Sequence, residues 1–203
     1  MILGLVSFIG VKTCEYFKEQ ERLEEQRRLH ELEQTDYKYV LKNLLVGSLE
    51  CGKSSILNSI SGLPFPGVYT RTIGVDFVIL KVGKVKFQIW EGAGDPRFRS
   101  IVHSYFKGQH VYTICYDVTS KKSFEEVDYW YKEMIQIASD QPFWLLGLKT
   151  DLESKRVIPT VDGEKYARDR NMFFLEFSSK EDSIKVFNSK MEEISSKLIH
   201  TNF

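Results

Sequence analysis

Residues 47–55 read Gly47-Ser48-Leu49-Glu50-Cys51-Gly52-Lys53-Ser54-Ser55, which fits the pattern G-x-x-x-x-G-K-S. In a phosphate-binding loop of this kind, the glycines let the backbone bend around a phosphate because no side chain stands in the way. The lysine, here Lys53, contacts the outer phosphates, and the hydroxyl of the next residue, Ser54, ligates Mg²⁺. A glycine-rich turn could match this pattern by chance. The flanking sequence distinguishes such a turn from a phosphate-binding loop.

The flanking residues favour the phosphate-binding interpretation. Residues 39–46 are mostly apolar and read as a strand, and residues 54–60 read as the first turns of a helix. A strand, loop and helix in this order direct backbone N–H groups and a helix N-terminus at one point in space. An anion is favoured at that point.

The composition is that of a globular domain with a short appendage. The chain has 203 residues, of which 42% are hydrophobic and 28% are charged, and its formal net charge is zero. This balance gives no indication of a nucleic-acid partner. The three cysteines, Cys14, Cys51 and Cys115, show neither C-x-x-C nor metal-type spacing. We therefore expect a reducing compartment without disulfide bonds.

Residues 1–36 are predicted to form an N-terminal extension, followed by one domain over residues 37–200. The apolar stretch 1–11 is too short to span a bilayer, which takes about 20 residues. Residues 1–14 therefore form either an interfacial membrane anchor, aided by acylation of Cys14, or a hydrophobic arm that packs on the domain or on a partner. Both alternatives stay open here.

Residues 15–34 are rich in charge and contain neither glycine nor proline. Oppositely charged side chains recur at i,i+4 spacing, which favours a solvated helix. Its few leucines are too sparse for a coiled-coil seam. A polar spacer helix is thus favoured over a dimerisation helix.

From residue 37 onward, strand and helix patterns alternate. The predicted strands are residues 39–46, 74–82, 85–90, 111–118, 143–148 and 172–177, and the predicted helices are residues 54–60, 123–138, 162–170 and 182–199. The second and third strands form a hairpin around Gly83-Lys84. Such alternation predicts an α/β fold with a six-stranded, mostly parallel sheet, helices on both faces, and ligands at the carboxyl ends of the strands.

Four further segments stand at these strand ends. They are T-R-T-I-G-V-D-F at 70–77, W-E-G-A-G-D-P-R-F-R-S-I at 90–101, G-L-K-T-D-L at 147–152 and L-E-F-S-S-K at 175–180. Together with residues 47–55, in order and spacing, they resemble the five nucleotide boxes of the Ras superfamily. The T-I-G-V-D-F and R-F-R-S-I segments are similar to those of the Rab family of small GTPases. The resemblance covers residues 39–198 and implies the three-layer P-loop small-GTPase fold.

The resemblance implies a molecular switch that binds GTP or GDP together with Mg²⁺. The residues expected to contact the nucleotide are Leu49, Glu50, Cys51, Gly52, Lys53, Ser54, Ser55, Tyr69, Thr72, Gly94, Lys149, Asp151, Ser178, Ser179 and Lys180. The expected metal site consists of Ser54 and Thr72, with Glu91 acting through a water. Asp151 would accept two hydrogen bonds from guanine, and this would reject adenine.

The resemblance also implies partners. Effector proteins would bind an apolar surface around Ile73, Phe77 and Trp90, and an exchange factor and a GTPase-activating protein are expected. The function would lie in vesicle traffic or signalling, with the protein cytoplasmic or peripheral on an intracellular membrane. The sequence ends without the terminal cysteines of a prenylated Rab. Membrane contact would then fall to residues 1–14 or to a partner.

Several residues depart from the family pattern. Where the family has D-T-A-G-Q-E, this chain has Glu91-Gly92-Ala93-Gly94-Asp95-Pro96. Asp95 stands in place of the glutamine that orients the attacking water. A carboxylate has no amide donor and adds negative charge beside a negative transition state. Leu49 would crowd the γ-phosphate. We therefore expect slow GTP hydrolysis. Each tenfold loss of rate corresponds to about 1.4 kcal/mol of additional activation free energy.

One residue of the base loop also departs from the family pattern, and one residue of the P-loop carries a thiol. Leu148 replaces the asparagine of the N-K-x-D box, so we expect the loss of a purine contact and of the tie between this loop and the P-loop. Guanine affinity should fall while Asp151 keeps the selectivity. Cys51 is either open to thiol reagents or packed into the domain, and packing is favoured.

Three hypotheses follow. The first is a Rab-like switch with weak hydrolysis, carried by the intact P-loop, Thr72, Gly94 and Asp151. The second is a pseudoGTPase, a nucleotide-insensitive interaction module, motivated by the departures at 91, 95 and 148. The third, another P-loop enzyme such as a kinase or ATPase, has only Lys53 and Ser54 in its favour.

Overall fold

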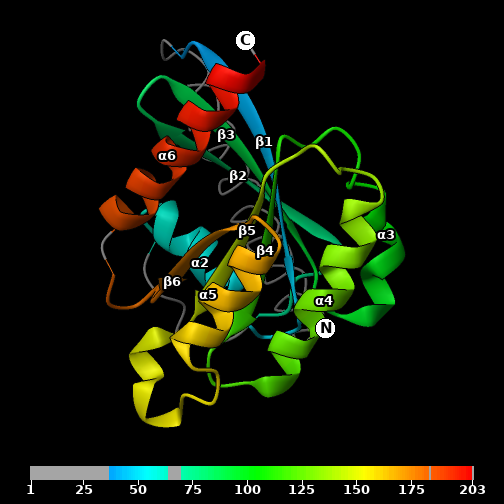
Figure 1. The fold of residues 1–203 in the computed structure, drawn as a ribbon, viewed down its shortest axis with the longest axis vertical. Coiled ribbons are helices and arrows are strands. Elements are labelled where there is room, and N and C mark those ends of the chain that lie inside the picture. The colour runs from blue at the N-terminus through cyan, green and yellow to red at the C-terminus, as the bar shows by residue number, and fades with distance from the viewer. Residues whose placement is uncertain (1–36, 64–69, 183, 203) are drawn as a thin grey trace, which may run out of the picture. The chain divides into compact units, whose positions relative to one another are not determined.

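The computed structural model describes residues 37–63, 70–182 and 184–202 (Figure 1). The predicted N-terminal extension, with its membrane or arm segment 1–14 and spacer helix, lies outside these residues, and so does Tyr69. The expectations placed on them stay predictions. In the part of the chain that is described, no helix is long and apolar enough to cross a membrane.

A six-stranded sheet forms the centre of the domain. Its strands are β1 (Tyr39–Gly47), β2 (Val75–Val82), β3 (Val85–Gly92), β4 (Val111–Asp117), β5 (Phe143–Leu148) and β6 (Phe173–Phe177). They lie in the order β2-β3-β1-β4-β5-β6. Neighbours are parallel except β2 and β3, which form the predicted antiparallel hairpin with Val82 opposite Val85. The predicted six-stranded, mostly parallel sheet is confirmed.

Helices cover both faces of this sheet (Figure 1). They are α2 (Lys53–Ile60), α3 (Arg99–His103), α4 (Lys121–Ile135), α5 (Thr160–Asp169) and α6 (Ile184–Asn202). Side chains of α2 and α6 share one buried cluster with the sheet, and those of α3, α4 and α5 share the other. Two short 3₁₀ turns, η1 (Pro96–Phe98) and η2 (Thr150–Lys155), complete the described elements.

The start of α4 and the presence of η1 differ from the sequence prediction. Helix α4 begins at Lys121, because the Ser120 hydroxyl caps it by accepting a hydrogen bond from the N–H of Ser123 at 3.3 Å. At η1 the Asp95 side chain accepts from the N–H of Arg97, and Pro96 occupies the first position. An aspartate followed by proline is a typical helix start, so a local signal for η1 was present.

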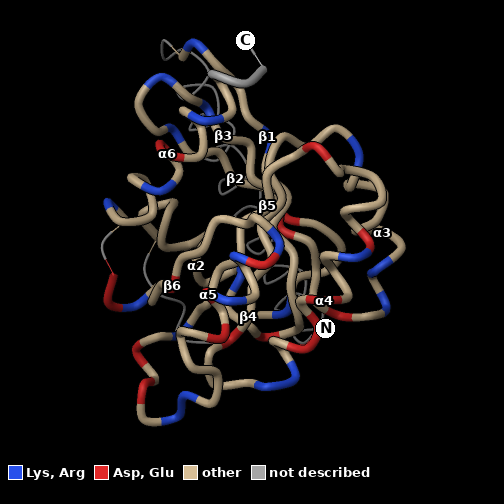
Figure 2. Tube along the Cα trace, viewed as in Figure 1, with Lys and Arg blue, Asp and Glu red and all other residues tan. Residues whose placement is uncertain are grey.

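The core follows from the apolar strands. Every residue of β4 and β5 is buried, and the indole rings of Trp130 and Trp144 are almost wholly covered from opposite faces. Burial of one such large side chain contributes about 1.5–3 kcal/mol. Charged residues of both signs are distributed along the described helices and loops (Figure 2). This distribution fits the net charge of zero.

All the family-like segments meet at one edge of the sheet. The parallel strands β1, β3, β4, β5 and β6 end there. The antiparallel strand β2 begins there, because Val75 pairs with Gly92, and the N–H of Ala93 donates to the carbonyl of Gly74 at 2.9 Å. Segments far apart in sequence are therefore brought to a common edge, as the sequence predicts for a ligand site.

Candidate functional site

The loop between β1 and α2 has the backbone that its glycines permit. Gly47 has a φ of 151° and Gly52, the N-cap of α2, has a φ of 109°. A Cβ on Gly47 would stand 2.3 Å from the carbonyl oxygen of Cys115, so only glycine fits there. The Cys51 side chain is 1% exposed, and burial raises the pKa of its thiol. This agrees with the predicted inward packing of Cys51.

The ammonium group of Lys53 is fixed against this loop. Its Nζ donates to the carbonyl oxygens of Gly47 at 3.0 Å and Ser48 at 2.8 Å, and the residue is 5% exposed. A buried cation is costly without such partners. The loop therefore holds one positive charge at a defined place beside the N-terminus of α2, where an anion is also favoured.

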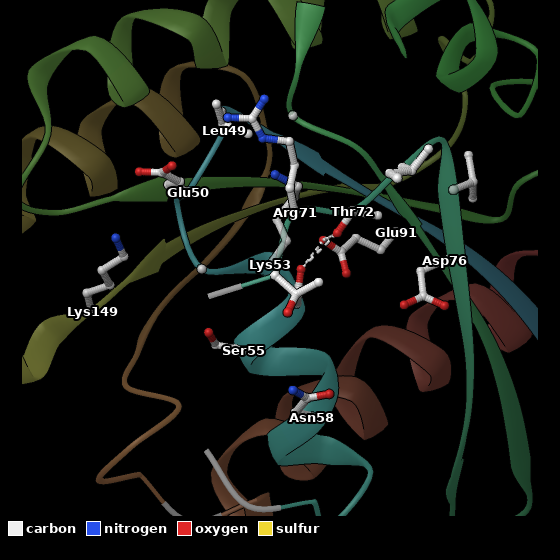
Figure 3. A pocket seen from close by; sticks show the side chains of 16 residues that line it. Leu49, Glu50, Lys53, Ser55, Asn58, Arg71, Thr72, Asp76, Glu91 and Lys149 are labelled. Atoms are coloured by element: carbon white, nitrogen blue, oxygen red, sulfur yellow. Dashed lines mark hydrogen bonds between the residues drawn. The ribbon is translucent and has the colours of Figure 1, made fainter. Parts of the chain in front are cut away.

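A cavity of about 870 Å³ opens beside Lys53 and the start of α2 (Figure 3). Its volume is that of a site for a small organic ligand. It is lined by Leu49, Glu50, Gly52, Lys53, Ser54, Ser55, Asn58, Thr70, Arg71, Thr72, Ile73, Val75, Asp76, Glu91, Gly94 and Lys149. In Figure 3, Glu50 and Lys149 lie at one end and Asp76 lies at the other.

Three oxygen-bearing side chains converge on the wall of this cavity. Oε1 of Glu91 accepts from Ser54 Oγ at 2.7 Å and from Thr72 Oγ1 at 3.2 Å, and the two hydroxyl oxygens lie 3.1 Å apart (Figure 3). Glu91 is 1% exposed, and its Oε2 is buried without a hydrogen-bond partner among the described residues. Burial raises the pKa of this carboxyl, and Lys53 opposes the rise.

This cluster fits a hard divalent cation. Carboxylate and hydroxyl oxygens are the ligands that Mg²⁺ prefers. A cation at this place would also satisfy the buried Oε2 of Glu91 and favour its charged form. Ser54, Thr72 and Glu91, the predicted metal residues, are therefore brought together, although the role of each stays a prediction.

Asp95 faces arginines and not the cavity. Its Oδ1 accepts from the N–H of Arg97 at 3.0 Å, while Nε and Nη2 of Arg97 lie 3.1 Å and 2.7 Å from Oδ2. Nη1 of Arg71 adds a contact to Oδ2 at 3.1 Å. The hydrogen bonds from Arg97 lower the pKa of Asp95 to about 2, so the carboxylate is charged at neutral pH.

The loop after β5 is joined to the P-loop by apolar packing. Leu148 is 1% exposed, and a Cβ on Gly52 would lie 3.4 Å from Leu148 Cδ1. Leu148 shares a buried apolar cluster with Cys51 of the P-loop but carries no amide, so the expected loss of the hydrogen-bonded tie stays a prediction. The next residue, Lys149, has a φ of 67° and pairs with Oδ2 of Asp117 at 2.7 Å.

The carboxylate of Asp151 is oriented by the loop after β6. Its Oδ1 accepts from Ser178 Oγ at 2.9 Å, and that same hydroxyl oxygen accepts from the N–H of Lys180 at 3.2 Å. The N–H of Ser178 in turn donates to Oδ2 of Asp182 at 2.6 Å. Asp151 and residues 178–180 thus lie on adjoining loops at the same sheet edge, beyond the residues that line the cavity.

Comparison with known proteins agrees with this geometry. A model of the Ras family matches residues 42–198. Ras-related protein RABD2a of Arabidopsis thaliana is 42% identical over 151 residues, which is 72% of this chain and 74% of that protein. GTP-binding protein YPT1 of Saccharomyces cerevisiae is 42% identical over 150 residues, or 71% of this chain and 73% of that protein.

The chain belongs to the Rab family of small GTPases. A third relative, Ras-related protein RABE1d of Arabidopsis thaliana, is 39% identical over 176 residues. The match covers 83% of this Rab chain and 82% of RABE1d.

An aromatic row joins β2, β3 and the segment that follows α3 in this Rab chain. The rings of Phe77 and Trp90 lie 4.4 Å apart, and those of Trp90 and Tyr105 lie 5.3 Å apart. Ile73 is 78% exposed. The predicted surface residues Ile73, Phe77 and Trp90 are thus on neighbouring elements, and Tyr105 extends the row beyond the residues that the sequence indicates.

Sequence reasoning missed Arg71, Arg97 and Asp117 as site residues. Arg71 lines the cavity and contacts Asp95, Arg97 holds Asp95, and Asp117 pairs with Lys149. The helix-start signature at Asp95-Pro96 was the one local signal, because it predicts that the aspartate side chain turns back toward Arg97. The other contacts join separate loops.

Gly94 of the Rab chain packs tightly on the P-loop, and its replacement should be costly. A Cβ on Gly94 would stand 2.5 Å from both the carbonyl carbon of Ser48 and the nitrogen of Leu49. Because these are backbone atoms, the turn that carries Gly94 has to move. We expect Gly94→Ala to lower the free energy of unfolding by about 1–3 kcal/mol, measured by denaturant titration. Unchanged stability would show that the turn is not held against the P-loop.

Proposed function

We propose that this Rab protein is a guanine-nucleotide-binding switch that hydrolyses GTP slowly and acts in membrane traffic. The observation that carries the proposal is the convergence of Ser54, Thr72 and Glu91 beside the fixed ammonium of Lys53, on the wall of a cavity of about 870 Å³. One end of a nucleotide carries phosphates and Mg²⁺, and these groups match this cluster.

In the proposed complex the P-loop surrounds the phosphates. Backbone N–H groups of residues 49–55 and the ammonium of Lys53 bind the phosphate oxygens, and the N–H of Gly94 contacts the γ-phosphate. Ser54 and Thr72 would hold Mg²⁺ directly and Glu91 would hold it through a water. Mg²⁺ neutralises charge on the phosphate oxygens when it is bound. Tyr69 would close over the phosphates.

The base would lie between the loops that follow β5 and β6. Asp151 accepts from the N1–H and the exocyclic amine of guanine, in the orientation that Ser178 fixes. Lys149 and Lys180 lie along the base and the sugar, and the backbone near Ser179 meets the guanine oxygen. Adenine would leave the carboxylate poorly paired, which is the basis of selectivity.

Slow hydrolysis follows from two side chains. The carboxylate of Asp95 already accepts hydrogen bonds from guanidinium and backbone N–H groups. A carboxylate only accepts, so it lacks the N–H donor that the amide of a glutamine provides. Leu49 lines the cavity beside Gly94, where it would crowd the γ-phosphate. Both features raise the barrier for attack by water.

Asp95→Gln should speed hydrolysis. It restores an amide donor and removes a negative charge, so we expect single-turnover GTP hydrolysis to rise about tenfold or more. Arg97→Gln is the matched control, because it releases Asp95 from its main partner without adding an amide at position 95. We expect no gain for that control. Equal rates for wild type and Asp95→Gln would contradict the assignment of Asp95.

The nucleotide carried by the purified protein tests the proposal as a whole. The protein would be denatured and the released nucleotide identified by ion-exchange chromatography. We expect GDP or GTP in near-stoichiometric amount, and a large share of GTP would indicate slow hydrolysis. Bound adenine nucleotide would overturn the guanine assignment.

A second function, a pseudoGTPase that binds partners regardless of nucleotide, is favoured by one observation. Asp95 occupies the position of the residue that acts at the γ-phosphate in a working GTPase. Here its carboxylate is paired with Arg71 and Arg97. Equal capture of a partner with GDP, with a GTP analogue and without nucleotide would support this alternative. Capture of the partner only with the GTP analogue would contradict this alternative.

The partners follow from the family. We infer that effectors bind the surface of Ile73, Phe77 and Trp90, and that an exchange factor and a GTPase-activating protein act on the loops around the cavity. The protein would work as a peripheral protein on an intracellular membrane, through residues 1–14 or through a partner. The relatives named as GTP-binding or Ras-related proteins support the nucleotide and the family.

A further inference from the structure

We propose that Arg71, Asp95 and Arg97 form an ionic clamp that holds segment 70–76 against turn 91–97 whichever guanine nucleotide is bound. The name switch clamp is used below for these three residues. The inference deepens the proposed function, since it concerns how strongly the same site responds to the γ-phosphate. It assigns a structural role to the residue at the position of the water-orienting glutamine.

Besides the β2–β3 pairing of Val75 with Gly92 and of Asp76 with Glu91, three contacts join the two segments, one from every second residue of the turn. Oε1 of Glu91 accepts from Thr72, the N–H of Ala93 donates to the carbonyl of Gly74 at 2.9 Å, and Oδ2 of Asp95 accepts from Nη1 of Arg71 at 3.1 Å. Segment 70–76 is thus attached at its start, its middle and the point where it enters β2. The clamp supplies the attachment at the start.

The position of Asp95 is itself fixed by Arg97. The guanidinium of Arg97 contacts Oδ2 through Nη2 at 2.7 Å, and the backbone N–H of Arg97 contacts Oδ1 at 3.0 Å. The Asp95 side chain is 7% exposed, while those of Arg71 and Arg97 are 44% and 71% exposed. A nearly buried carboxylate that receives donors from both sides has little freedom to turn elsewhere.

Both partners in each ion pair of the clamp are protein side chains, so the pairs use neither the nucleotide nor the metal. In a switch that depends on the γ-phosphate, the segment and the turn are held by the phosphate and its metal, and both are released when the phosphate is lost. The attraction between Arg71 and Asp95 involves neither group, so it persists when the γ-phosphate is lost. A ligand shifts a conformational equilibrium only by its differential affinity for the two states, and the clamp reduces that difference.

The consequence reaches the predicted effector surface. Ile73 lies between Thr72 and Gly74, both of which contact the turn, and it is 78% exposed. If the clamp keeps segment 70–76 in place, the exposed side chain of Ile73 keeps one position relative to β2 in both nucleotide states. Partner recognition at this surface would then differ less between the two nucleotide states than in a switch without the clamp.

Amide hydrogen exchange tests the clamp directly. Peptides that cover Ala93, whose N–H donates to the carbonyl of Gly74 across the two segments, would be followed in the full chain loaded with GDP and with a non-hydrolysable GTP analogue. For the wild type we expect exchange rates in the two states to agree within about twofold. For Arg71→Gln and for Asp95→Asn we expect the GDP state to exchange about tenfold faster than wild type, with a smaller change in the analogue state.

Two controls keep the test decisive. Arg168→Gln removes an arginine charge from the exposed side of α5 and should leave the exchange of the Ala93 amide unchanged. The double variant Arg71→Gln/Asp95→Asn should exchange like the single variants, because either change alone breaks the same contact. Since Arg71 is half-exposed, Arg71→Gln gives the answer even if the change at Asp95 disturbs folding.

The clamp is overturned if the wild type already exchanges about tenfold faster with GDP than with the analogue, or if neither variant changes the GDP state. Failure of the proposed function looks different, because the protein would then bind no guanine nucleotide. In that case the nucleotide-free proteins are compared. The clamp still predicts faster exchange of the Ala93 amide in Arg71→Gln than in wild type, and equal exchange would contradict it.

Discussion

Lys53→Ala is expected to lower the affinity for GDP and GTP by at least about a hundredfold. The ammonium is the cation that the P-loop carries, and it is 5% exposed at the wall of the cavity. Charge-assisted hydrogen bonds contribute about 1.5–3 kcal/mol each, and a hundredfold change in affinity corresponds to about 2.8 kcal/mol. Titration with fluorescent GDP measures the effect.

The same substitution also frees the carbonyl groups of Gly47 and Ser48, so stability has to be measured alongside binding. Lys132→Ala is a suitable control, because that lysine lies on α4 and pairs with Asp128 at 2.6 Å. We expect normal GDP affinity for the control. If Lys53→Ala folds and binds GDP as tightly as wild type, the P-loop is not the phosphate site.

Asp151→Asn is expected to lower the affinity for GDP at least about a hundredfold while the affinity for ADP changes little. The amide replaces one acceptor oxygen by a donor, which would then face an N–H of guanine. A site built to pair a polar group of its ligand discriminates strongly against a ligand that leaves the pair unmade. Competition of GDP and ADP against a fluorescent nucleotide gives the ratio.

Two further variants separate the base contact from general effects at this edge. Glu153→Ala removes a side chain that is 70% exposed on the same turn, and it should leave the ratio unchanged. Ser178→Ala removes the hydroxyl that holds Asp151, so we expect a smaller loss of about tenfold in GDP affinity. If Asp151→Asn keeps the full preference for GDP over ADP, a group other than Asp151 recognises the base.

The elements of the fold could be predicted because their signals are local. The apolar run of β5 matches the structure from Phe143 to Leu148, and the hairpin turn at Gly83-Lys84 sits where the two strand patterns meet. The glycines of the P-loop mark the positions where the backbone requires them. Periodicity and turn chemistry are properties of neighbouring residues, so one sequence is enough to find them.

The contacts between loops were not predictable in the same way. Arg71 and Asp95 are 24 residues apart, and Asp151 and Ser178 are 27 residues apart. Their pairing depends on how separate loops pack at the sheet edge, and no spacing rule relates them. Leu148 shows the same limit, because its effect was judged from the hydrogen bonds it cannot make, whereas the structure also buries it in one apolar cluster with Cys51 of the P-loop.

The central claim is that the cavity beside Lys53 binds guanine nucleotide with Mg²⁺, and nucleotide titration tests it most directly. The protein would be freed of nucleotide and titrated with fluorescent GDP, GTP and ATP, each with Mg²⁺ and with a chelator. We predict tight binding of GDP and GTP that weakens without Mg²⁺, and binding of ATP that is weaker by at least about a hundredfold. Indifference of the folded protein to all three nucleotides would contradict the claim.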